Sequence, residues 1–239
     1  MNAPTGLPRA ASPSVGNVTR TGQAGSPRAA GLLLAAGEGA RLGRPKALIE
    51  LGGQTLAERG VALLRDGGTH PVLVVTGAVP LSLAAAHAVH NPDWRTGMGS
   101  SLAAGLRALS CIDCQAVVVA LADQPLVGAN SVRRLIAAWR EGATVAVAAY
   151  DGKPRNPVLI AREHWDSVLE LATGDSGARP FLRAHPGLVR HVECGDTGSP
   201  YDVDTPEDLA RVAGVSTFRS DENSLVPTGR RRSAWAPAR

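Results

Sequence analysis

Glycines and cations follow a run of apolar residues near the N-terminus, in "AGLLLAAGEGARLGRPKALIEL" at residues 30–51. A buried strand that runs into a Gly-rich turn brings backbone N–H groups close to a bound anion, commonly a nucleotide phosphate. Gly37, Gly39 and Gly43 form G-x-G-x-x-x-G, whereas the dinucleotide fingerprint requires G-x-G-x-x-G. An ATP-binding P-loop requires a glycine before its lysine, but Lys46 follows a proline. Arg41 and Lys46 are therefore expected to bind phosphates in a loop of neither type.

The segment between residues 30 and 214 alternates apolar runs with amphipathic stretches. This alternation predicts an α/β fold with a mostly parallel, doubly wound sheet and helices on both faces. Ligands bind beyond the carboxyl ends of such strands, where the Gly-rich loop and Asp123 of "LADQP" are both expected to lie. The expected strands are 31–36, 71–77, 116–125, 144–150, 157–160 and 187–193, and the expected helices are 55–68, 100–110, 130–142, 162–174 and 205–214.

The two ends of the chain differ in composition from the middle. Residues 1–29 are rich in Pro, Gly, Ser and Ala, and residues 215–239 include "GRRRSAWAPAR", so both are predicted to be disordered tails around one domain at 30–214. The net charge of +4 comes from these ends, which argues against a nucleic-acid partner. No apolar run approaches the ~20 residues of a membrane helix, and no signal-peptide core is present, so a cytoplasmic chain without a membrane partner is expected.

Three cysteines raise the question of zinc or redox chemistry. Cys111 and Cys114 form "CIDC", and His191 with Cys194 could complete four ligands. The "CIDC" pair falls in a connection between an expected helix and an expected strand. An incidental pair of loop cysteines is therefore the favoured interpretation.

Six blocks of the sequence, taken together, are more specific than any one of them. They resemble the MobA-like nucleotidyltransferase family over residues 31 to about 213, and within it most closely the molybdenum cofactor cytidylyltransferases. The resemblance implies a single Rossmann-like domain that joins a nucleoside triphosphate to a phosphorylated acceptor and releases pyrophosphate. The blocks are "LLLAAGEGARLGRPKALIELGG", "NPDWRTGMGSSLAAGL", "ALADQPLV", "NPVLI", "GDSGARPFL" and "DVDTPEDL".

The resemblance also implies roles for individual residues. Arg41 and Lys46 are implied to hold the triphosphate and act in catalysis, with Mg²⁺ as cofactor. Mg²⁺ is usually held by one or two carboxylates together with substrate phosphates and water, so few acidic residues suffice. The implied nucleotide site consists of Ala35, Ala36, Gly37, Gly39, Ser100, Ser101 and Asp123. The implied metal ligands are Asp123 and either Asp202 or Asp204. The implied acceptor site consists of Arg155, Asn156, Asp175, Gly177 and Arg179.

These observations predict an Mg²⁺-dependent cytidylyltransferase that transfers CMP from CTP to the phosphate of molybdopterin. Ala36 and Gln124 resemble the cytidylyl pattern, and the methyl group of Ala36 narrows the space for a purine. A transient contact with a molybdoenzyme or its maturation factor is a further expectation.

Two alternatives stay open. One is an NAD(P)H-dependent oxidoreductase of the nicotine blue oxidoreductase type, because some chains that resemble this family are described in that way. The other is a non-catalytic nucleotide-binding module. The presence of Arg41, Lys46, Asp123 and Asp204 together argues against the second alternative, because a simple binder does not need the metal-binding acids.

Overall fold

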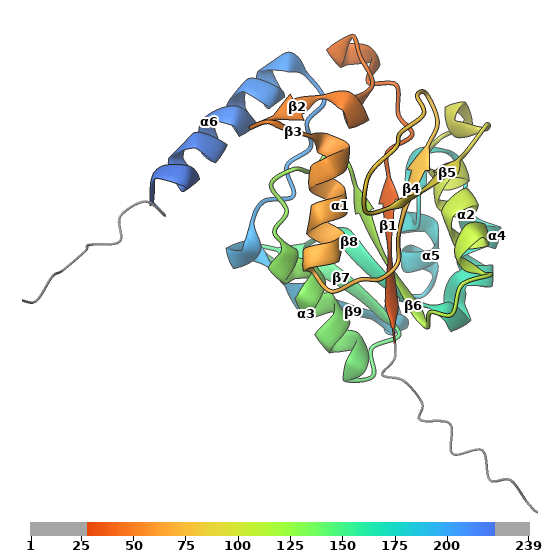
Figure 1. The fold of residues 1–239 in the computed structure, drawn as a ribbon. Coiled ribbons are helices and arrows are strands. Elements are labelled where there is room, and N and C mark those ends of the chain that lie inside the picture. The colour runs from red at the N-terminus through yellow and green to blue at the C-terminus, as the bar shows by residue number, and fades with distance from the viewer. Residues whose placement is uncertain (1–27, 223–239) are drawn as a thin grey trace, which may run out of the picture.

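A seven-stranded mixed sheet forms the centre of the molecule, in a computed structural model that describes residues 28–222 (Figure 1). Its strand order is β5-β4-β1-β6-β8-β7-β9. The strands are β1 (Ala29–Leu34), β4 (Val72–Thr76), β5 (His87–His90), β6 (Ala116–Leu121), β7 (Val145–Tyr150), β8 (Lys153–Ala161) and β9 (Val189–Glu193). The helices are α1 (Leu56–Asp66), α2 (Met98–Leu109), α3 (Ala129–Arg140), α4 (Trp165–Leu171), α5 (Arg179–Ala184) and α6 (Pro206–Glu222).

The predicted α/β fold with a mostly parallel sheet is confirmed, and one strand departs from the parallel pattern. β8 runs antiparallel to both of its neighbours, β6 and β7. It follows β7 through a tight turn at Asp151 and Gly152, which both have positive φ (51° and 72°). Asp-Gly is a preferred pair for such a hairpin turn. The chain therefore enters β8 directly from its neighbour, without the crossover helix that a parallel strand requires.

Helices pack against the apolar strands on both faces of the sheet. Every residue of β1 and β6 is buried, as expected for strands covered on both sides. Leu33 packs in one core cluster with α1 and α3, whereas its neighbour Leu32 packs in another with α2, α4 and α5. Figure 1 shows the two helix layers on opposite sides of the sheet. The sequence did not reveal the short elements β5 and α5.

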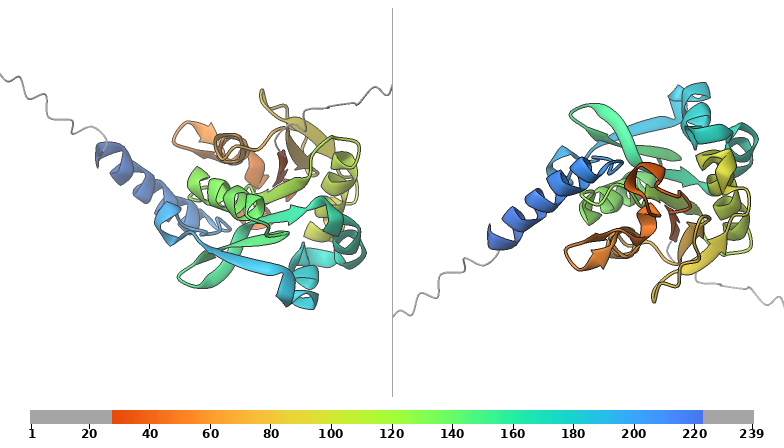
Figure 2. Two further views of the ribbon diagram at one scale, coloured as in Figure 1. Left: turned by 90° about the horizontal axis from the view of Figure 1, so that it is seen from below. Right: turned by 90° about the horizontal axis from the view of Figure 1, so that it is seen from above.

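A third, smaller core joins an early and a late part of the chain. β2 (Glu50–Leu51) and β3 (Gln54–Thr55) form a hairpin whose turn glycines both have positive φ. Ile49, Leu51 and Leu56 from this region pack with Val203 and with Val212 of α6. We call this set the third cluster. Both views in Figure 2 show α6 extending outward from the main body of the fold.

The C-terminal boundary of the domain differs from the predicted one. α6 begins at Pro206. Thr205 N donates to Asp208 Oδ2 and Asp208 N donates to Thr205 Oγ1, so these two residues cap the start of the helix reciprocally. The helix continues past Gly214 to Glu222, so the segment predicted as a tail from residue 215 begins as helix. Residues such as Ser and Thr have low helix propensity, but an established helix extends through them at little cost. At the other end, the tail predicted over residues 1–29 is too long, because Ala29 is a buried residue of β1. The rest of the predicted tails, 1–27 and 223–239, lies outside the described residues.

Candidate active site

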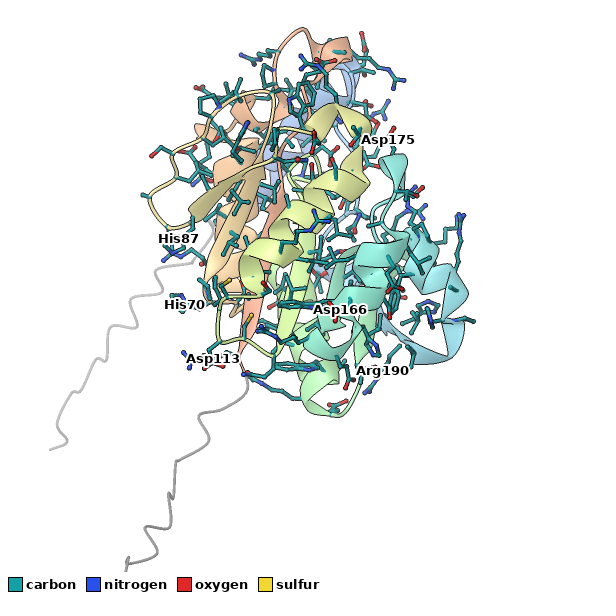
Figure 3. All side chains as sticks on the ribbon, turned by 90° about the vertical axis from the view of Figure 1, so that its right-hand side faces the viewer. His70, His87, Asp113, Asp166, Asp175 and Arg190 are labelled. Atoms are coloured by element: carbon teal, nitrogen blue, oxygen red, sulfur yellow. The ribbon has the colours of Figure 1, made fainter. Side chains whose placement is uncertain are left out.

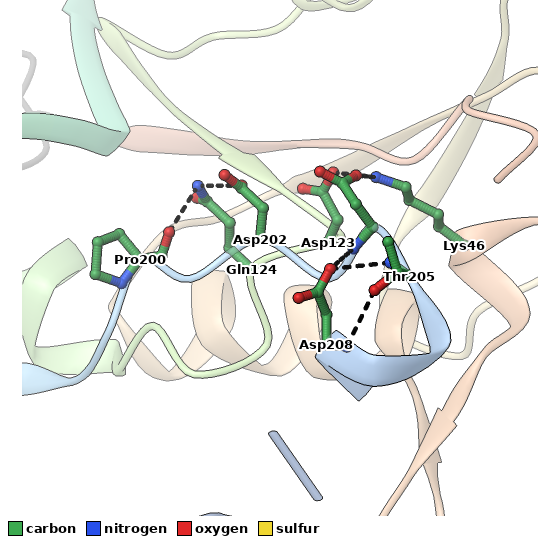
Figure 4. Close-up of polar contacts among 8 residues, drawn as sticks. Lys46, Asp123, Gln124, Pro200, Asp202, Thr205 and Asp208 are labelled. Carbon is green, nitrogen blue, oxygen red and sulfur yellow. Dashed lines mark hydrogen bonds and ion pairs between the residues drawn. The ribbon is translucent and has the colours of Figure 1, made fainter. Parts of the chain in front are cut away.

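An ammonium group lies between two carboxylates at the carboxyl ends of the central strands. Lys46 Nζ donates to Asp123 Oδ2 at 2.9 Å and also to Asp204 Oδ1 (Figure 4). Lys46 follows the Gly-rich loop, Asp123 follows β6, and Asp204 precedes α6. We call these three residues the lysine centre. Two of the three predicted metal-binding acids and one predicted phosphate-binding cation therefore meet in one place.

The electrostatics of the lysine centre keep its lysine charged. Burial by itself lowers the pKa of Lys46, but the attraction of Asp123 and Asp204 outweighs it, so this pKa lies above its ordinary value. The nearby Asp202 behaves differently. Burial raises the pKa of Asp202, and the charges of Asp123 and Asp204 raise it further.

The structure separates the two candidate partners of Asp123. Asp204 shares Lys46 with Asp123, whereas Asp202 accepts a hydrogen bond from Gln124 Nε2 at 2.9 Å (Figure 4). The Gln124 amide also points to the Pro200 carbonyl at 3.4 Å. Gln124 thus orients the segment before α6, and both of its side-chain hydrogen bonds among residues 28–222 are donated by Nε2 to that segment.

The acids of the lysine centre fit a divalent cation that is shared with a substrate. Asp123 Oδ1 is buried and has no hydrogen-bond partner within residues 28–222. An unpaired, buried carboxylate oxygen is costly, and a cation relieves that cost. No three His, Cys, Asp or Glu side chains in this part of the chain form a metal-binding group. Asp123 and Asp204 therefore suit an ion such as Mg²⁺ that keeps water and phosphate ligands.

The Gly-rich loop leaves the sheet with unused donors. Ala35 and Ala36 are buried and hydrogen-bonded to β4 and the residues that follow it. Ala35 N donates to Val75 O, and Ala36 O accepts from Ala78 N. Within residues 28–222, the backbone N–H groups of residues 36–39 donate no hydrogen bond. Such a run of free N–H groups is a common anion site.

Gly39 is required where it stands. Its φ is +65°, and a side chain there would begin 2.2 Å from the Arg44 carbonyl oxygen and 3.2 Å from Lys46 Cγ. The loop therefore runs directly beside the stem of Lys46. Arg41, in contrast, is exposed and forms no ion pair with Asp123, Asp204 or any other acid among residues 28–222.

Ser100 and Ser101 lie in the first turn of α2, but they do not cap it. The capping position is Gly97, which supplies no side-chain bond. Both serine hydroxyl groups instead accept hydrogen bonds from Asn91 Nδ2, at 2.9 and 3.1 Å. Asn91 is 3 % exposed. It thereby connects the segment after β5 to the start of α2. Asn91 is the first residue of the block "NPDWRTGMGSSLAAGL", but the sequence alone did not show its contact with the two serines.

A pocket of about 690 Å³ adjoins the lysine centre through Gln124 and Asp202. Arg155, Asn156 and Arg179, three of the five residues that the resemblance assigns to an acceptor site, line it. We call this cavity the arginine pocket. Its other lining residues include Arg183, His191, Leu121, Val147 and Val158.

A strand irregularity and a tight turn shape the arginine pocket. The register of β7 and β8 shifts between Val147 and Ala148, opposite Asn156, and such bulges redirect side chains. Asp175 and Gly177 do not line the pocket. Asp175 Oδ1 accepts a long bond (3.4 Å) from Met98 N, and Figure 3 shows Asp175 near the start of α2. These two residues therefore shape the turn that carries Ser176 and Arg179.

Arg183 and His191 are lining residues that the sequence analysis missed. They lie on the short helix α5 and the edge strand β9. No pattern distinguishes Arg183 from a solvated residue, and His191 was considered only as a possible zinc ligand together with Cys194. None of Arg155, Arg179 and Arg183 forms an ion pair within the described part of the chain. The pocket thus combines uncompensated positive charge with an apolar floor.

The cysteines do not form a site in the described region. Cys114 packs in the core cluster of α2, whereas Cys194 packs in the cluster of α1 and α3, on the other face of the sheet. Cys111 is exposed. Burial raises the pKa of both Cys114 and Cys194, which makes their thiols less reactive.

No helix among the described residues is long and apolar enough to cross a membrane.

The fold and the lysine centre define an α/β protein with a nucleotidyltransferase architecture. The chain belongs to the family described as MobA-like NTP transferase domain, whose sequence profile matches residues 31–190. A solved structure, the Mycobacterium tuberculosis rv0371c homolog from Mycobacterium sp. strain JC1, superposes with a TM-score of 0.70 at 32 % identity. That superposition covers 80 % of this chain and 98 % of the other.

Two curated relatives carry different functional names. Nicotine blue oxidoreductase of Paenarthrobacter nicotinovorans is 39 % identical over 200 residues, which cover 78 % of this chain and 97 % of that protein. A probable molybdenum cofactor guanylyltransferase of Opitutus terrae is 34 % identical over 163 residues, covering 67 % of this chain and 79 % of the relative. The predicted family is confirmed, but the predicted cytidylyltransferase branch is not, because the relative named as an oxidoreductase is more similar than the guanylyltransferase.

Proposed function

We propose that this protein is a divalent-metal-dependent nucleotidyltransferase that attaches a nucleoside monophosphate to a phosphorylated acceptor. The observation that carries the proposal is the convergence of Lys46, Asp123 and Asp204 beside the Gly-rich loop, next to the arginine pocket. Phosphoryl-type transfer requires positioning and charge neutralisation rather than a nucleophilic side chain. The lysine centre and the pocket supply both.

In the proposed reaction, a phosphate oxygen of the acceptor attacks the α-phosphorus of the nucleotide, and the bond to pyrophosphate breaks. The free N–H groups of residues 36–39 bind the phosphates, with Arg41 at the same loop. Lys46 neutralises charge that grows on the leaving pyrophosphate. Mg²⁺, when bound by Asp123 and Asp204, supplies further charge neutralisation. Arg155 and Arg179 orient the anionic acceptor.

The finer proposal is CTP as the nucleotide and molybdopterin as the acceptor. The preference for CTP over GTP depends on Ala36, because the Gln124 amide is bonded to Asp202. One methyl group discriminates by only ~1–3 kcal/mol, so we expect a preference of roughly 10- to 200-fold. Calorimetry of both nucleotides measures it directly, and tighter binding of GTP contradicts it.

The comparisons support a second candidate, an oxidoreductase like the relative from Paenarthrobacter. Its 39 % identity extends over 97 % of that relative's length. A loop with free N–H groups and a pocket with unpaired guanidinium groups also suit the phosphates of a nicotinamide dinucleotide. Hydride transfer, however, gives Asp123 and Asp204, the two acids that share Lys46, no evident role.

One paired assay separates these functions. Purified protein is tested for pyrophosphate release from CTP, GTP and ATP with Mg²⁺, with and without molybdopterin, and in parallel for NADPH oxidation with a quinonoid dye. Acceptor-dependent pyrophosphate release that disappears in Asp123→Asn supports the nucleotidyltransferase. NADPH oxidation that is retained in Asp123→Asn, without pyrophosphate release, supports the oxidoreductase. Nucleotide binding with neither activity supports the non-catalytic module.

A further inference from the structure

The two carboxylates that the proposed function assigns to a metal are already bonded to a cation of the protein. Lys46 Nζ lies 2.9 Å from Asp123 Oδ2 and contacts Asp204 Oδ1, while Asp123 Oδ1 is buried without a partner. Only 21 % of the Lys46 side chain and 23 % of the Asp123 side chain are exposed. The Asp204 side chain is 45 % exposed, so the ammonium group holds the two acids in a partly buried site, where unpaired like charges would repel each other.

A metal ion that arrives alone faces an unfavourable exchange at this site. It must take the carboxylate oxygens from Lys46, and the displaced ammonium group then loses both of the ion pairs that it forms among residues 28–222. Breaking a partly buried pair in this way is costly, because it leaves an uncompensated charge. If a nucleotide arrives as well, its phosphates receive Lys46 and the charges stay balanced.

The chain places Lys46 within reach of both positions. Ala47 and Ile49 are buried, and Ile49 belongs to the third cluster, so the backbone that carries Lys46 is fixed. The Gly39 backbone, in the loop with free N–H groups, lies against the Lys46 stem. The flexible four-carbon stem of lysine can therefore redirect the ammonium group without a change in the fold.

We propose that Lys46 is an internal competitor of the metal, which occupies Asp123 and Asp204 until nucleotide phosphates draw it away. The proposal rests on the proposed function, since it deepens the role of the same site. It makes metal binding conditional on nucleotide. When a site is free in only a fraction of the molecules, its apparent Kd equals the intrinsic Kd divided by that fraction, so the ligand binds more weakly.

Manganese alone is the probe, because the electron paramagnetic resonance signal of free Mn²⁺ falls when the ion binds. The full chain is titrated without nucleotide as wild type, as Lys46→Met and as Arg44→Met. Arg44 is exposed and close in sequence, and it contacts neither acid, so its variant controls for the loss of one positive charge. We expect Lys46→Met to bind Mn²⁺ about tenfold or more tightly than wild type, whereas Arg44→Met changes the affinity less than about twofold.

Two further measurements guard against a folding artefact. The melting temperature of Lys46→Met should be lower than that of wild type without metal and should recover when Mn²⁺ is added. The double variant Lys46→Met with Asp123→Asn should lose the gain in affinity. If both hold, the gain belongs to the two freed carboxylates and not to a rearranged protein.

The outcomes also separate this proposal from the proposed function. Equal Mn²⁺ affinity of wild type and Lys46→Met overturns the competitor role, and it leaves the nucleotidyltransferase intact if wild type still releases pyrophosphate. Absence of Mn²⁺ binding in Lys46→Met overturns the competitor role and also removes the assigned metal ligands. Tighter binding by Lys46→Met in a protein that releases no pyrophosphate supports the competitor role and overturns the nucleotidyltransferase.

Discussion

The lysine centre and the arginine pocket adjoin each other, yet they treat charge in opposite ways. At the lysine centre, Lys46 is bonded to two carboxylates. In the arginine pocket, three guanidinium groups have no carboxylate partner within residues 28–222. The first region must exchange partners before it binds a ligand, whereas the second can accept an anion as it stands.

This difference in charge pairing indicates how each region should contribute to the binding of an anionic ligand. Uncompensated cations around an apolar floor raise the local potential and attract anions, an effect that weakens with salt. A paired and largely buried centre contributes little to that long-range attraction. We therefore expect substitutions in the arginine pocket to alter mainly binding, and substitutions in the lysine centre to alter mainly turnover.

The largest effect is expected from Asp123→Asn. An amide cannot offset the charge of a divalent cation, so turnover should fall by ~10³-fold or more while metal-free nucleotide binding is retained. Pyrophosphate release with Mg²⁺ measures the first quantity and calorimetry without metal measures the second. Asp204→Asn should behave in the same way, and Asp202→Asn should cost less because Gln124 holds that side chain. Undiminished turnover in Asp123→Asn removes the mechanism.

The next effect comes from the phosphate-binding cations. Arg41→Ala or Lys46→Met should each lower turnover by roughly a hundredfold, the ~3 kcal/mol typical of one lost preorganised donor. Only the Lys46 variant should change the affinity for Mn²⁺ alone. Near-normal turnover in either variant shows that the corresponding residue does not bind the triphosphate.

Substitutions in the arginine pocket should change the binding of the acceptor and leave the turnover rate unchanged. Arg183→Gln is expected to raise the KM for the acceptor about tenfold, the cost of one charge-assisted bond, with kcat and melting temperature almost unchanged. Steady-state kinetics with a varied acceptor tests this. Arg140→Gln, on exposed α3 surface outside the pocket, is the matched control. A fall in kcat without a change in KM contradicts the contrast between the two regions.

A smaller effect on both quantities is expected from Val212→Ala in the third cluster. Loss of two buried methyl groups should lower the free energy of unfolding by about 1–2 kcal/mol, measured by urea denaturation. Turnover should also fall, because the cluster holds the segment that carries Asp204. A destabilised variant with unchanged turnover shows that the position of Asp204 does not depend on the cluster.

The smallest effect is expected from removal of the chain ends. The sequence predicts disordered tails at both ends, and the structure moves the start of the C-terminal tail from residue 215 to a point after Glu222, where α6 ends. Deletion of 1–27 and 223–239 should change the free energy of unfolding by less than ~0.5 kcal/mol. Calorimetric melting of the shortened protein measures this, and a large drop in melting temperature refutes it.

Patterns that depend on one stretch of sequence predicted the fold well. The apolar runs of β1 and β6 and the amphipathic stretches of α1 and α3 follow directly from burial on one or two faces. The direction of β8 was not predictable from its own residues, because strand polarity depends on the partner. The Asp151–Gly152 turn is the signal that could have revealed the β7–β8 hairpin.

The candidate site was predictable to the level of its segments but not of its contacts. The motifs placed Lys46, Asp123 and Asp204 in separate blocks, and sequence spacing carries no information on which atoms meet. It therefore could not choose between Asp202 and Asp204, nor show that Lys46 bonds to the acids. Asn91, Arg183 and His191 were missed for the same reason, since each gains its role only from a tertiary neighbour.

The third cluster has a consequence for the order in which the protein is made. Lys46 and Asp204 are 158 positions apart, and the cluster that secures them includes Val212 of α6. A growing chain emerges from the ribosome with its N-terminal part first, and the strands of the sheet all precede α6. The sheet and the Gly-rich loop can therefore form while synthesis continues, but the lysine centre cannot. An unfinished chain thus lacks the site until nearly the whole domain has been translated.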